Sequence, residues 1–97
     1  MSFDPFIVRD QIGMMNVLAI SGGRWYYDSD AKSVTLPVRY GYKVVVTYNE
    51  GSDDYTVQRI HVRGTNVTVK GELTGIYNDN LGDIAYRASC YRDQFGE

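Results

Sequence analysis

The chain has 97 residues, enough for one compact domain and too few for two. Its 10 lysines and arginines against 12 aspartates and glutamates give a net charge of −2, which excludes a polycationic protein held on nucleic acid by overall charge. Hydrophobic residues make up 43% of the sequence and are spread along it, so neither a disordered chain nor a membrane-spanning one is expected. We therefore expect one soluble domain over residues 1–97.

Cysteine use and the amino-terminal residues favour a cytoplasmic protein. Cys90 is the single cysteine, so it cannot close an internal disulfide, and this fits a reducing compartment. Residues 1–13 carry Asp4, Arg9 and Asp10 and lack the uninterrupted apolar stretch of a secretory signal. We expect a location in the cytoplasm and no membrane partner.

The chain begins with the pattern of a short helix. Asp4 suits the N-cap, Pro5 suits the first helical position, and Gly13 predicts the end. A helix of this length is unstable alone, so apolar residues such as Phe6 and Ile12 must pack on something larger.

From residue 16 onward, runs of β-branched and aromatic residues recur between turn residues. This pattern is typical of antiparallel strands joined by tight turns, and connections this short favour a meander. The predicted sheet is curved, with five or six strands. The runs lie at 17–20, 25–27, 34–36, 40–48, 55–62 and 67–69, and the turns lie at 21–23, 28–30, 50–54 and 64–65.

The end of the sequence changes to a helical period. Apolar residues spaced as one helical stripe lie at Leu81, Ile84, Ala85 and Ala88. Asn80 followed by Asp83 approximates a capping box and predicts the start of this helix. The expected fold is therefore a single α+β domain with an antiparallel sheet, a short N-terminal helix and a C-terminal amphipathic helix.

Residues 63–66 allow the register of one hairpin to be predicted. Gly64 at the first of two central positions is typical of a type II′ turn. The resulting pairs are Val62 with Val67 and Ile60 with Val69. These four β-branched side chains then share one face, which is predicted to face the core.

Earlier in the same strand, Tyr55 and Val57 have the parity opposite to that of Ile60 and Val62. A continuous strand would place the two pairs on different faces of the sheet. We therefore expect either a bulge near residues 58–59, which we favour, or coverage of the sheet on both faces.

The same register gathers basic residues on the predicted non-core face. Arg59 lies opposite Lys70, although like charges directly across a ladder are unfavourable. The predicted partner-binding patch consists of Lys43, Arg59, His61, Arg63 and Lys70. One interpretation is that these long side chains are simply solvated. The other is that an acidic partner surface covers them, because arginine binds carboxylates in a bidentate manner.

Catalysis and cofactor binding are not expected. His61 and Cys90 have the chemistry of a base and a nucleophile, but nothing around Cys90 resembles a nucleophile motif. One histidine and one cysteine cannot make the usual zinc set. We therefore expect a noncatalytic protein without a cofactor or a metal.

Three stretches carry a resemblance to a known group of proteins: NVLAISGGR at 16–24, LPVRYGY at 36–42 and IAYRASCY at 84–91. The chain resembles small proteins encoded by tailed actinobacteriophages, notably mycobacteriophages, over nearly its whole length. The resemblance implies synthesis in the cytoplasm of an infected bacterium and action by binding a host protein. It implies no activity and no functional residues.

Several classes of function stay open. The first is a small noncatalytic protein-interaction module that acts on a host bacterial protein with an acidic surface. The alternative is a sequence-tolerant nucleic-acid-binding protein that uses the basic, aromatic sheet face, although the net charge disfavours nucleic acid as a partner. An enzyme and a virion or self-assembling component, which would be a homo-oligomer, complete the set.

Overall fold

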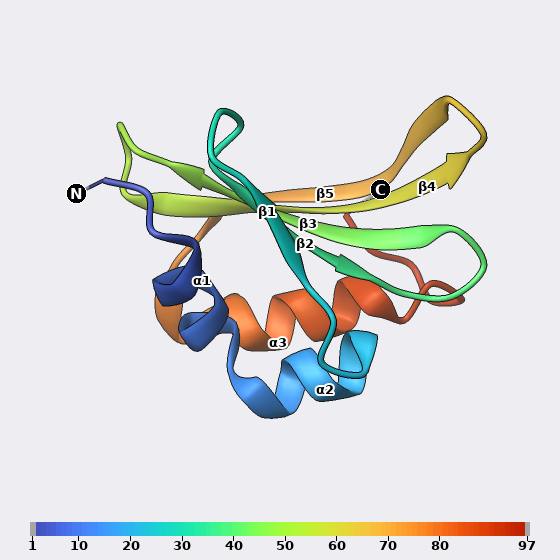
Figure 1. Ribbon diagram of the computed structural model, residues 1–97, viewed down its shortest axis with the longest axis horizontal. Coiled ribbons are helices and arrows are strands. Elements are labelled where there is room, and N and C mark those ends of the chain that lie inside the picture. The colour runs from blue at the N-terminus through green and yellow to red at the C-terminus, as the bar shows by residue number, and fades with distance from the viewer. Residues whose placement is uncertain (1, 97) are drawn as a thin grey trace.

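Within the described residues 2–96, the computed structural model has one five-stranded antiparallel sheet with three helices on one of its faces (Figure 1). The helices are α1 (Pro5–Ile12), α2 (Met14–Ser21) and α3 (Asn78–Ser89). The strands form a meander in the order β1-β2-β3-β4-β5, with bounds Tyr26–Asp28, Ser33–Pro37, Tyr42–Asn49, Asp54–Arg63 and Asn66–Ile76. The predicted α+β fold with an antiparallel sheet is confirmed. No helix among these residues is long and apolar enough to cross a bilayer.

Helix α1 begins and ends where the sequence predicts. Asp4 is the N-cap, and its carboxylate accepts a hydrogen bond from the Phe6 amide at 3.0 Å. Gly13, with φ 95°, is both the C-cap of α1 and the N-cap of α2. Val8 and Ile12 form the buried side of the helix.

Residues 17–20 belong to α2, so the strand predicted there is wrong. The buried residues are Val17 and Ile20, three apart as on a helix and not two apart as on a strand. The turn predicted after them is the helix end. Gly22 adopts the left-handed conformation with φ 67°, and its amide donates to the Leu18 carbonyl at 2.9 Å.

The predicted pairs of the β4–β5 hairpin are confirmed, but the face assigned to the core is wrong. Val62 lies opposite Val67, and Ile60 lies opposite Val69. These residues lie on the face away from the helices, where Val67 is 60% exposed and Val69 is 54% exposed.

Strand β4 keeps one register against β3 from Asp54 to His61, so its alternation is unbroken there. The irregularities lie in β5 instead, one opposite Tyr55–Val57 and one opposite Arg59–Ile60. Arg59 faces Gly71 while Ile60 faces Val69, and this leaves Lys70 as the extra residue. The sequence therefore located the bulge correctly along the ladder and assigned it to the wrong strand. Arg59 does not lie opposite Lys70 as predicted.

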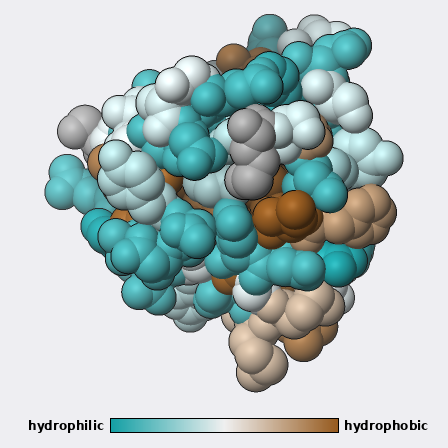
Figure 2. All heavy atoms as spheres, turned by 90° about the vertical axis from the view of Figure 1, so that its left-hand side faces the viewer, coloured by the Kyte–Doolittle hydropathy of each residue, from teal (hydrophilic) through white to brown (hydrophobic). Residues whose placement is uncertain are grey.

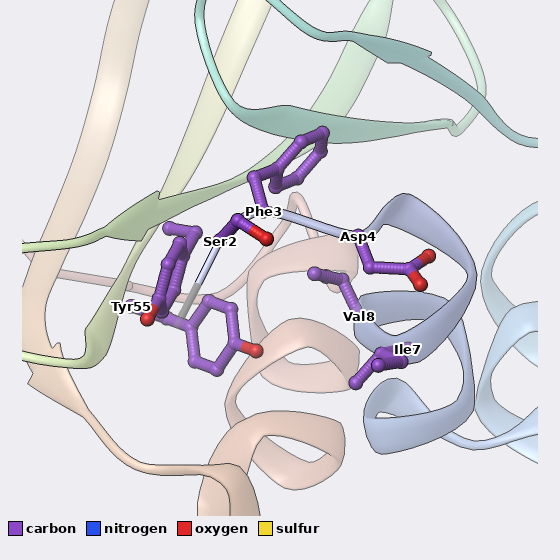
Figure 3. Close-up of a pocket in the computed structure, with 7 residues that line it drawn as sticks. Ser2, Phe3, Asp4, Ile7, Val8 and Tyr55 are labelled. Carbon is purple, nitrogen blue, oxygen red and sulfur yellow. The ribbon is translucent and has the colours of Figure 1, made fainter.

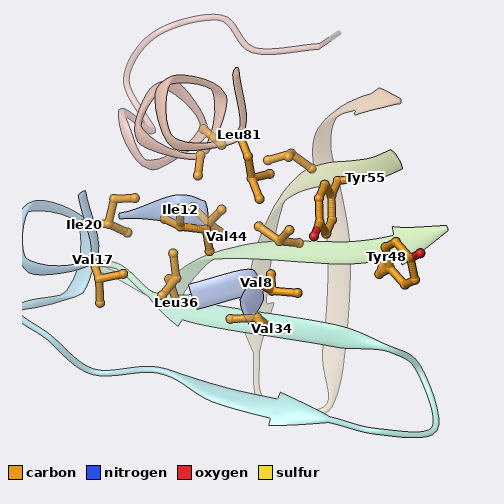
Figure 4. Close-up of a cluster of buried hydrophobic side chains, with 14 of the residues drawn as sticks. Val8, Ile12, Val17, Ile20, Val34, Leu36, Val44, Tyr48, Tyr55 and Leu81 are labelled. Carbon is orange, nitrogen blue, oxygen red and sulfur yellow. The ribbon is translucent and has the colours of Figure 1, made fainter. Parts of the chain in front are cut away.

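The core fills the space between the helices and the inner face of the sheet (Figure 4). Branched side chains of the central strands meet branched side chains of the helices, and all are shielded from water. Examples with at most 1% exposure are Val34, Val44, Val57, Ile12 and Leu81. Burial of such side chains contributes about 1.5–3 kcal/mol each and dominates the stability of the domain.

Helix α3 confirms the predicted amphipathic stripe, with Leu81, Ala85 and Ala88 buried. Its start differs from the prediction. Tyr77 is the N-cap and no side chain caps the helix, so the capping box expected at Asn80 is wrong.

The segment after α3, residues 90–96, folds back against the sheet. Phe95 is 1% exposed and belongs to the core. The Gly96 carbonyl accepts a hydrogen bond from the Glu72 amide at 3.1 Å. Gly71 permits this close approach, because a Cβ atom there would lie 1.8 Å from the Phe95 carbonyl oxygen.

Candidate functional site

A cavity beside the amino-terminal segment is too small for an organic ligand. It is lined by Ser2, Phe3, Asp4, Ile7, Val8, Tyr48 and Tyr55 (Figure 3). Its volume is about 10 Å³, the space of about one water molecule. Asp4, the one carboxylate lining it, already caps α1.

The turn between β2 and β3 presents an exposed tyrosine. Its central residues, Tyr40 and Gly41, have φ of 56° and 83°, and the Tyr42 amide donates to the Arg39 carbonyl at 3.0 Å. These are the features of a type I′ turn, for which Asn-Gly is the preferred sequence. A tyrosine in the left-handed region is strained, yet Tyr40 occupies it with 70% exposure.

Three tyrosines and a histidine meet beside this turn. The rings of Tyr42 and Tyr91 are stacked at 4.8 Å with an interplanar angle of 15°. Tyr40 packs edge to face on Tyr91 with 5.8 Å between the ring centres, and the His61 and Tyr42 ring centres are 4.8 Å apart. The turn and the segment after α3 both lie at the right-hand end of Figure 1. Such offset and edge-to-face pairs each contribute about 0.5–1.5 kcal/mol beyond their buried area.

Cations surround these rings. The Arg92 guanidinium lies 5.7 Å from the centre of the Tyr91 ring. A hollow of about 190 Å³ is lined in part by Tyr42, Lys70 and Arg92, and one of about 460 Å³ is lined in part by Arg39 and Arg92. Asp93 is the one acidic residue lining either hollow, so the local charge is positive.

We call this region the tyrosine–arginine surface. Its members are Arg39, Tyr40, Tyr42, Lys70, Tyr91 and Arg92. Within residues 2–96 the salt bridges are Arg9–Asp10 and Lys32–Glu50, so the three cations of the surface carry no ion pair. Their charges are available to an anionic group.

Arg59, a member of the predicted patch, is buried with 2% exposure. Its guanidinium lies under the end of α3 and donates to four carbonyls: Ala88 at 2.7 Å, Asp93 at 2.7 Å, Cys90 at 2.9 Å and Arg87 at 3.3 Å. It also lies 5.4 Å from the centre of the Phe95 ring. The expectation that Arg59 lies on an outer face is wrong, because continuous alternation turns it toward the helices.

The other predicted site residues are divided between the two faces of the sheet. Lys43 lies on the face away from the helices, where its Nζ donates to the Tyr26 hydroxyl at 2.7 Å. His61 and Lys70 lie beside the tyrosines, and the His61 Nε2 is 3.0 Å from the Tyr40 carbonyl. Arg63 is exposed at the end of the hairpin, opposite Asn66. The five residues therefore form no continuous patch.

The sequence argument missed Arg39, Tyr40, Tyr91 and Arg92. The one clue to this turn was Gly41, because glycine readily adopts the positive φ that a two-residue turn needs, but residues 40–41 were assigned to the predicted strand 40–48. Nothing in the pattern around Tyr91 and Arg92 indicated that the segment after α3 returns to this turn.

His61 and Cys90 have separate partners. His61 contacts Tyr40 and Tyr42, whereas the Cys90 thiol donates to the Tyr86 carbonyl at 3.5 Å. No hydrogen bond joins the two side chains among residues 2–96, and no group of three or more His, Cys, Asp and Glu residues there is arranged to hold a metal ion. The surface offers rings and cations, the groups suited to binding an anion.

No protein-family model, no curated protein and no solved structure matches this chain significantly. The assignment of function therefore depends on the geometry of the surface itself.

Proposed function

We propose that this chain is a noncatalytic protein-interaction module that binds an acidic segment of a partner protein through the tyrosine–arginine surface. The observation that carries the proposal is Tyr40, a residue that is 70% exposed on a backbone with φ 56°. Strained backbone persists where the surrounding structure holds it, and such positions cluster at binding sites.

The chemistry of the surface favours carboxylates with an apolar neighbour. Arg39 and Arg92 flank one hollow and can each hold a carboxylate through two parallel hydrogen bonds. Tyr40 and Tyr91 add flat apolar area with hydroxyl groups, and tyrosine and arginine are the residue types enriched at binding hot spots.

The resemblance to small actinobacteriophage proteins supports a host bacterial protein as the partner. A phage protein made in the cytoplasm of its host meets host proteins there at once, without any targeting step. The proposed role is therefore binding and modulation of a host protein through the tyrosine–arginine surface.

A panel of immobilised synthetic peptides tests the proposal. Acidic peptides with one apolar residue, their neutral amide counterparts and basic peptides are probed with the labelled chain at about 150 mM salt. We expect the acidic set to bind. The double variant Arg39→Glu, Arg92→Glu should weaken that binding at least about thirtyfold, equivalent to about 2 kcal/mol.

The matched control is Arg63→Glu, Arg87→Glu, which makes the same change in net charge at exposed positions outside the surface. It should retain most of the affinity. An equal loss in both double variants would show attraction by overall charge and contradict a localised site.

Tyr40→Asn separates binding from folding. The variant supplies the Asn-Gly sequence that the turn prefers, so the free energy of unfolding should stay within about 1 kcal/mol of the parent or rise. Affinity for the acidic peptides should fall, because the exposed ring is gone. A variant that binds as tightly as the parent would remove Tyr40 from the site.

Nucleic acid is the second candidate partner, favoured by an exposed ring among cations. Single-stranded nucleic acid is usually bound by stacking of successive bases on successive aromatic platforms. Here the rings of Tyr42 and Tyr91 stack on each other, which leaves Tyr40 as the one broadly exposed ring of the surface. Anisotropy with labelled oligo-dT should show no submicromolar binding, and tight binding would place this candidate first.

A further inference from the structure

The hollow of about 190 Å³ beside the stacked tyrosines has a buried cation in its lining. Arg59 lines it together with Tyr42, Lys70, Tyr91, Arg92, Asp93 and Gln94. Arg59 is 2% exposed, and its guanidinium donates four hydrogen bonds, all to main-chain carbonyls, of the five that a guanidinium can donate. Neither salt bridge within residues 2–96 includes Arg59. Buried charges are normally paired, so an anion in the hollow would complete the pairing of this cation.

The end of α3 does not oppose an anion here as a bare helix end would. The carboxyl end of a helix carries partial negative charge on its last carbonyls. The Arg59 guanidinium accepts this role of counter-charge, because it donates to the carbonyls of Arg87, Ala88 and Cys90. The repulsion between these carbonyls and an anion in the hollow is thereby reduced.

A bulge in β5 supplies the second cation. Lys70 is the extra residue between Val69, which faces Ile60, and Gly71, which faces Arg59. A bulge interrupts the alternation of a strand and re-aims a side chain, and bulges are over-represented next to active sites. Lys70 lines the hollow, is exposed, and belongs to neither salt bridge of the described chain.

The charges of the lining match a doubly charged group. Arg92, from the segment after α3, is the third cation, and Asp93 is the one carboxylate. The lining therefore has an excess of two positive charges. A phosphoryl group on a side chain carries about 1.5 to 2 negative charges at pH 7 and three acceptor oxygens, whereas a carboxylate carries one charge and two oxygens. A phosphoryl group is thus the better match.

The net charge of the molecule hides this site, because its acidic residues gather at the other end of the sheet. The turn between β3 and β4, with Glu50, Asp53 and Asp54 in it or directly after it, lies at the left-hand end of Figure 1. That end faces the viewer in Figure 2 and is mainly hydrophilic. The cationic hollow lies at the opposite end, where the segment after α3 meets the turn between β2 and β3.

We propose that this hollow is a phosphoryl-binding subsite, which takes a phosphomonoester on one side chain of the acidic partner segment. The proposal rests on the proposed function, because it places a protein segment on the tyrosine–arginine surface, and it adds the chemistry of one residue of that segment. Lys70 and Arg92 bind the phosphoryl oxygens, and the buried charge of Arg59 attracts them from below.

Fluorescence anisotropy with three versions of one labelled acidic peptide tests the proposal. The versions carry serine, glutamate or phosphoserine at one position, and each position of the peptide is substituted in turn at about 150 mM salt. At the best position we expect phosphoserine to bind at least about tenfold more tightly than glutamate. Lys70→Gln should reduce this ratio to about twofold or less and change the affinity for the glutamate peptide by at most about threefold.

The matched control is Lys43→Gln, which makes the same change in charge on the face of the sheet away from the helices. It should keep the tenfold ratio of the parent. Both variants should keep the circular dichroism spectrum of the parent, because neither lysine is buried.

The outcomes separate this subsite from the proposed function. Equal binding of the phosphoserine and glutamate peptides would overturn the subsite alone, as would an unchanged ratio in Lys70→Gln or an equal loss in Lys43→Gln. Tighter binding of inorganic phosphate than of the phosphoserine peptide would overturn the protein origin of the phosphoryl group.

If no acidic peptide binds, the proposed function fails, and amide shifts caused by free phosphoserine test the subsite directly. Shifts confined to the bulge at Lys70, the end of α3 and the segment after it would support the subsite. Shifts elsewhere, or no shifts, would overturn it.

Discussion

The guanidinium of Arg59 closes the carboxyl end of α3. The last carbonyls of a helix have no partner within the helix, and a cation there also complements the helix dipole. We expect Arg59→Met to lower the free energy of unfolding by about 3 kcal/mol, because several buried carbonyls lose their donors at once. Urea unfolding measures the loss.

Arg63→Met is the control for that variant, since Arg63 lies on the same strand and is exposed. Its stability should change by at most about 0.5 kcal/mol. Equal effects at the two positions would mean that the hydrogen bonds of Arg59 contribute no more than surface charge does.

Arg59 also shows what a local pattern misses. Its acceptors lie 28 to 34 residues away along the chain, on the last turn of α3 and the segment after it. A charged residue on a strand normally indicates the solvent side. An arginine that points inward is favourable here only because the carbonyls at the end of α3 lie above β4 and accept its hydrogen bonds. No residue spacing in the sequence predicts that α3 ends there.

At the scale of elements, the packing of α3 on the N-terminal helices depends on Gly82. A Cβ atom at this position would lie 2.5 Å from the Ile12 carbonyl oxygen and 2.6 Å from the Asn16 Nδ2. Helix propensity alone predicts that Gly82→Ala stabilises the protein by about 1 kcal/mol. We expect a net loss of about 2 kcal/mol instead, because α1 and α2 must move away from α3.

Thermal and urea unfolding of Gly82→Ala measure this loss, with Asn80→Ala as the control on the same helix. Asn80 is exposed, so the change to alanine there should be neutral or slightly stabilising. A stabilised Gly82→Ala would show that the helices can separate at little cost.

Helix α2 and strand β5 show two different limits of element prediction. Short apolar runs do not distinguish a strand from a buried helix, and for this reason a strand was predicted for residues 17–20, which belong to α2. In β5 the strand continues to Ile76 through Gly71 and Gly75, which the sequence presents as breaks. Both glycines have a structural reason: Gly71 admits the C-terminal segment, and Gly75 has φ 67°.

For the whole molecule, periodicity was enough to predict the fold class and the order of the strands. Each of the strand patterns from residue 25 onward corresponds to a strand, because turn residues separate them cleanly. The candidate site was predicted only in fragments. The site is formed by the turn between β2 and β3, the bulge in β5 and the segment after α3, which meet in space. The register of the β4–β5 hairpin relates only those two strands, so it could not predict this meeting.

The stability of the protein should depend on pH through Asp54, the first residue of β4 after the turn from β3. Hydrogen bonds from the Ser52 hydroxyl at 2.7 Å and from the side-chain amide of Asn49 at 3.0 Å lower the pKa of the Asp54 carboxyl group. The unfolded chain then takes up the proton more readily than the folded one. This stabilisation is complete above the ordinary aspartate pKa of about 3.9 and is lost as pH falls through the lower folded value.

Urea midpoints measured from about pH 7 to pH 2 test this sign. The difference between the parent and Asp54→Asn should shrink as pH falls below about 4. Ser52→Ala should reduce the acid sensitivity in part, because one hydrogen bond to the carboxylate remains. Parallel curves for the parent and Asp54→Asn would contradict the lowered pKa.

The carbonyls gathered around Arg59 also determine how the molecule opens. Chain ends usually fray first, and their amide protons exchange with solvent long before those of a central strand. Here, detaching the segment after α3 would leave the buried Arg59 guanidinium without several of its hydrogen-bond acceptors. We therefore expect the segment after α3, the last turn of α3 and β4 to open as one cooperative unit. The hydrogen-bonded amides of Cys90 and Asp93 should then exchange more slowly than those of a frayed chain end.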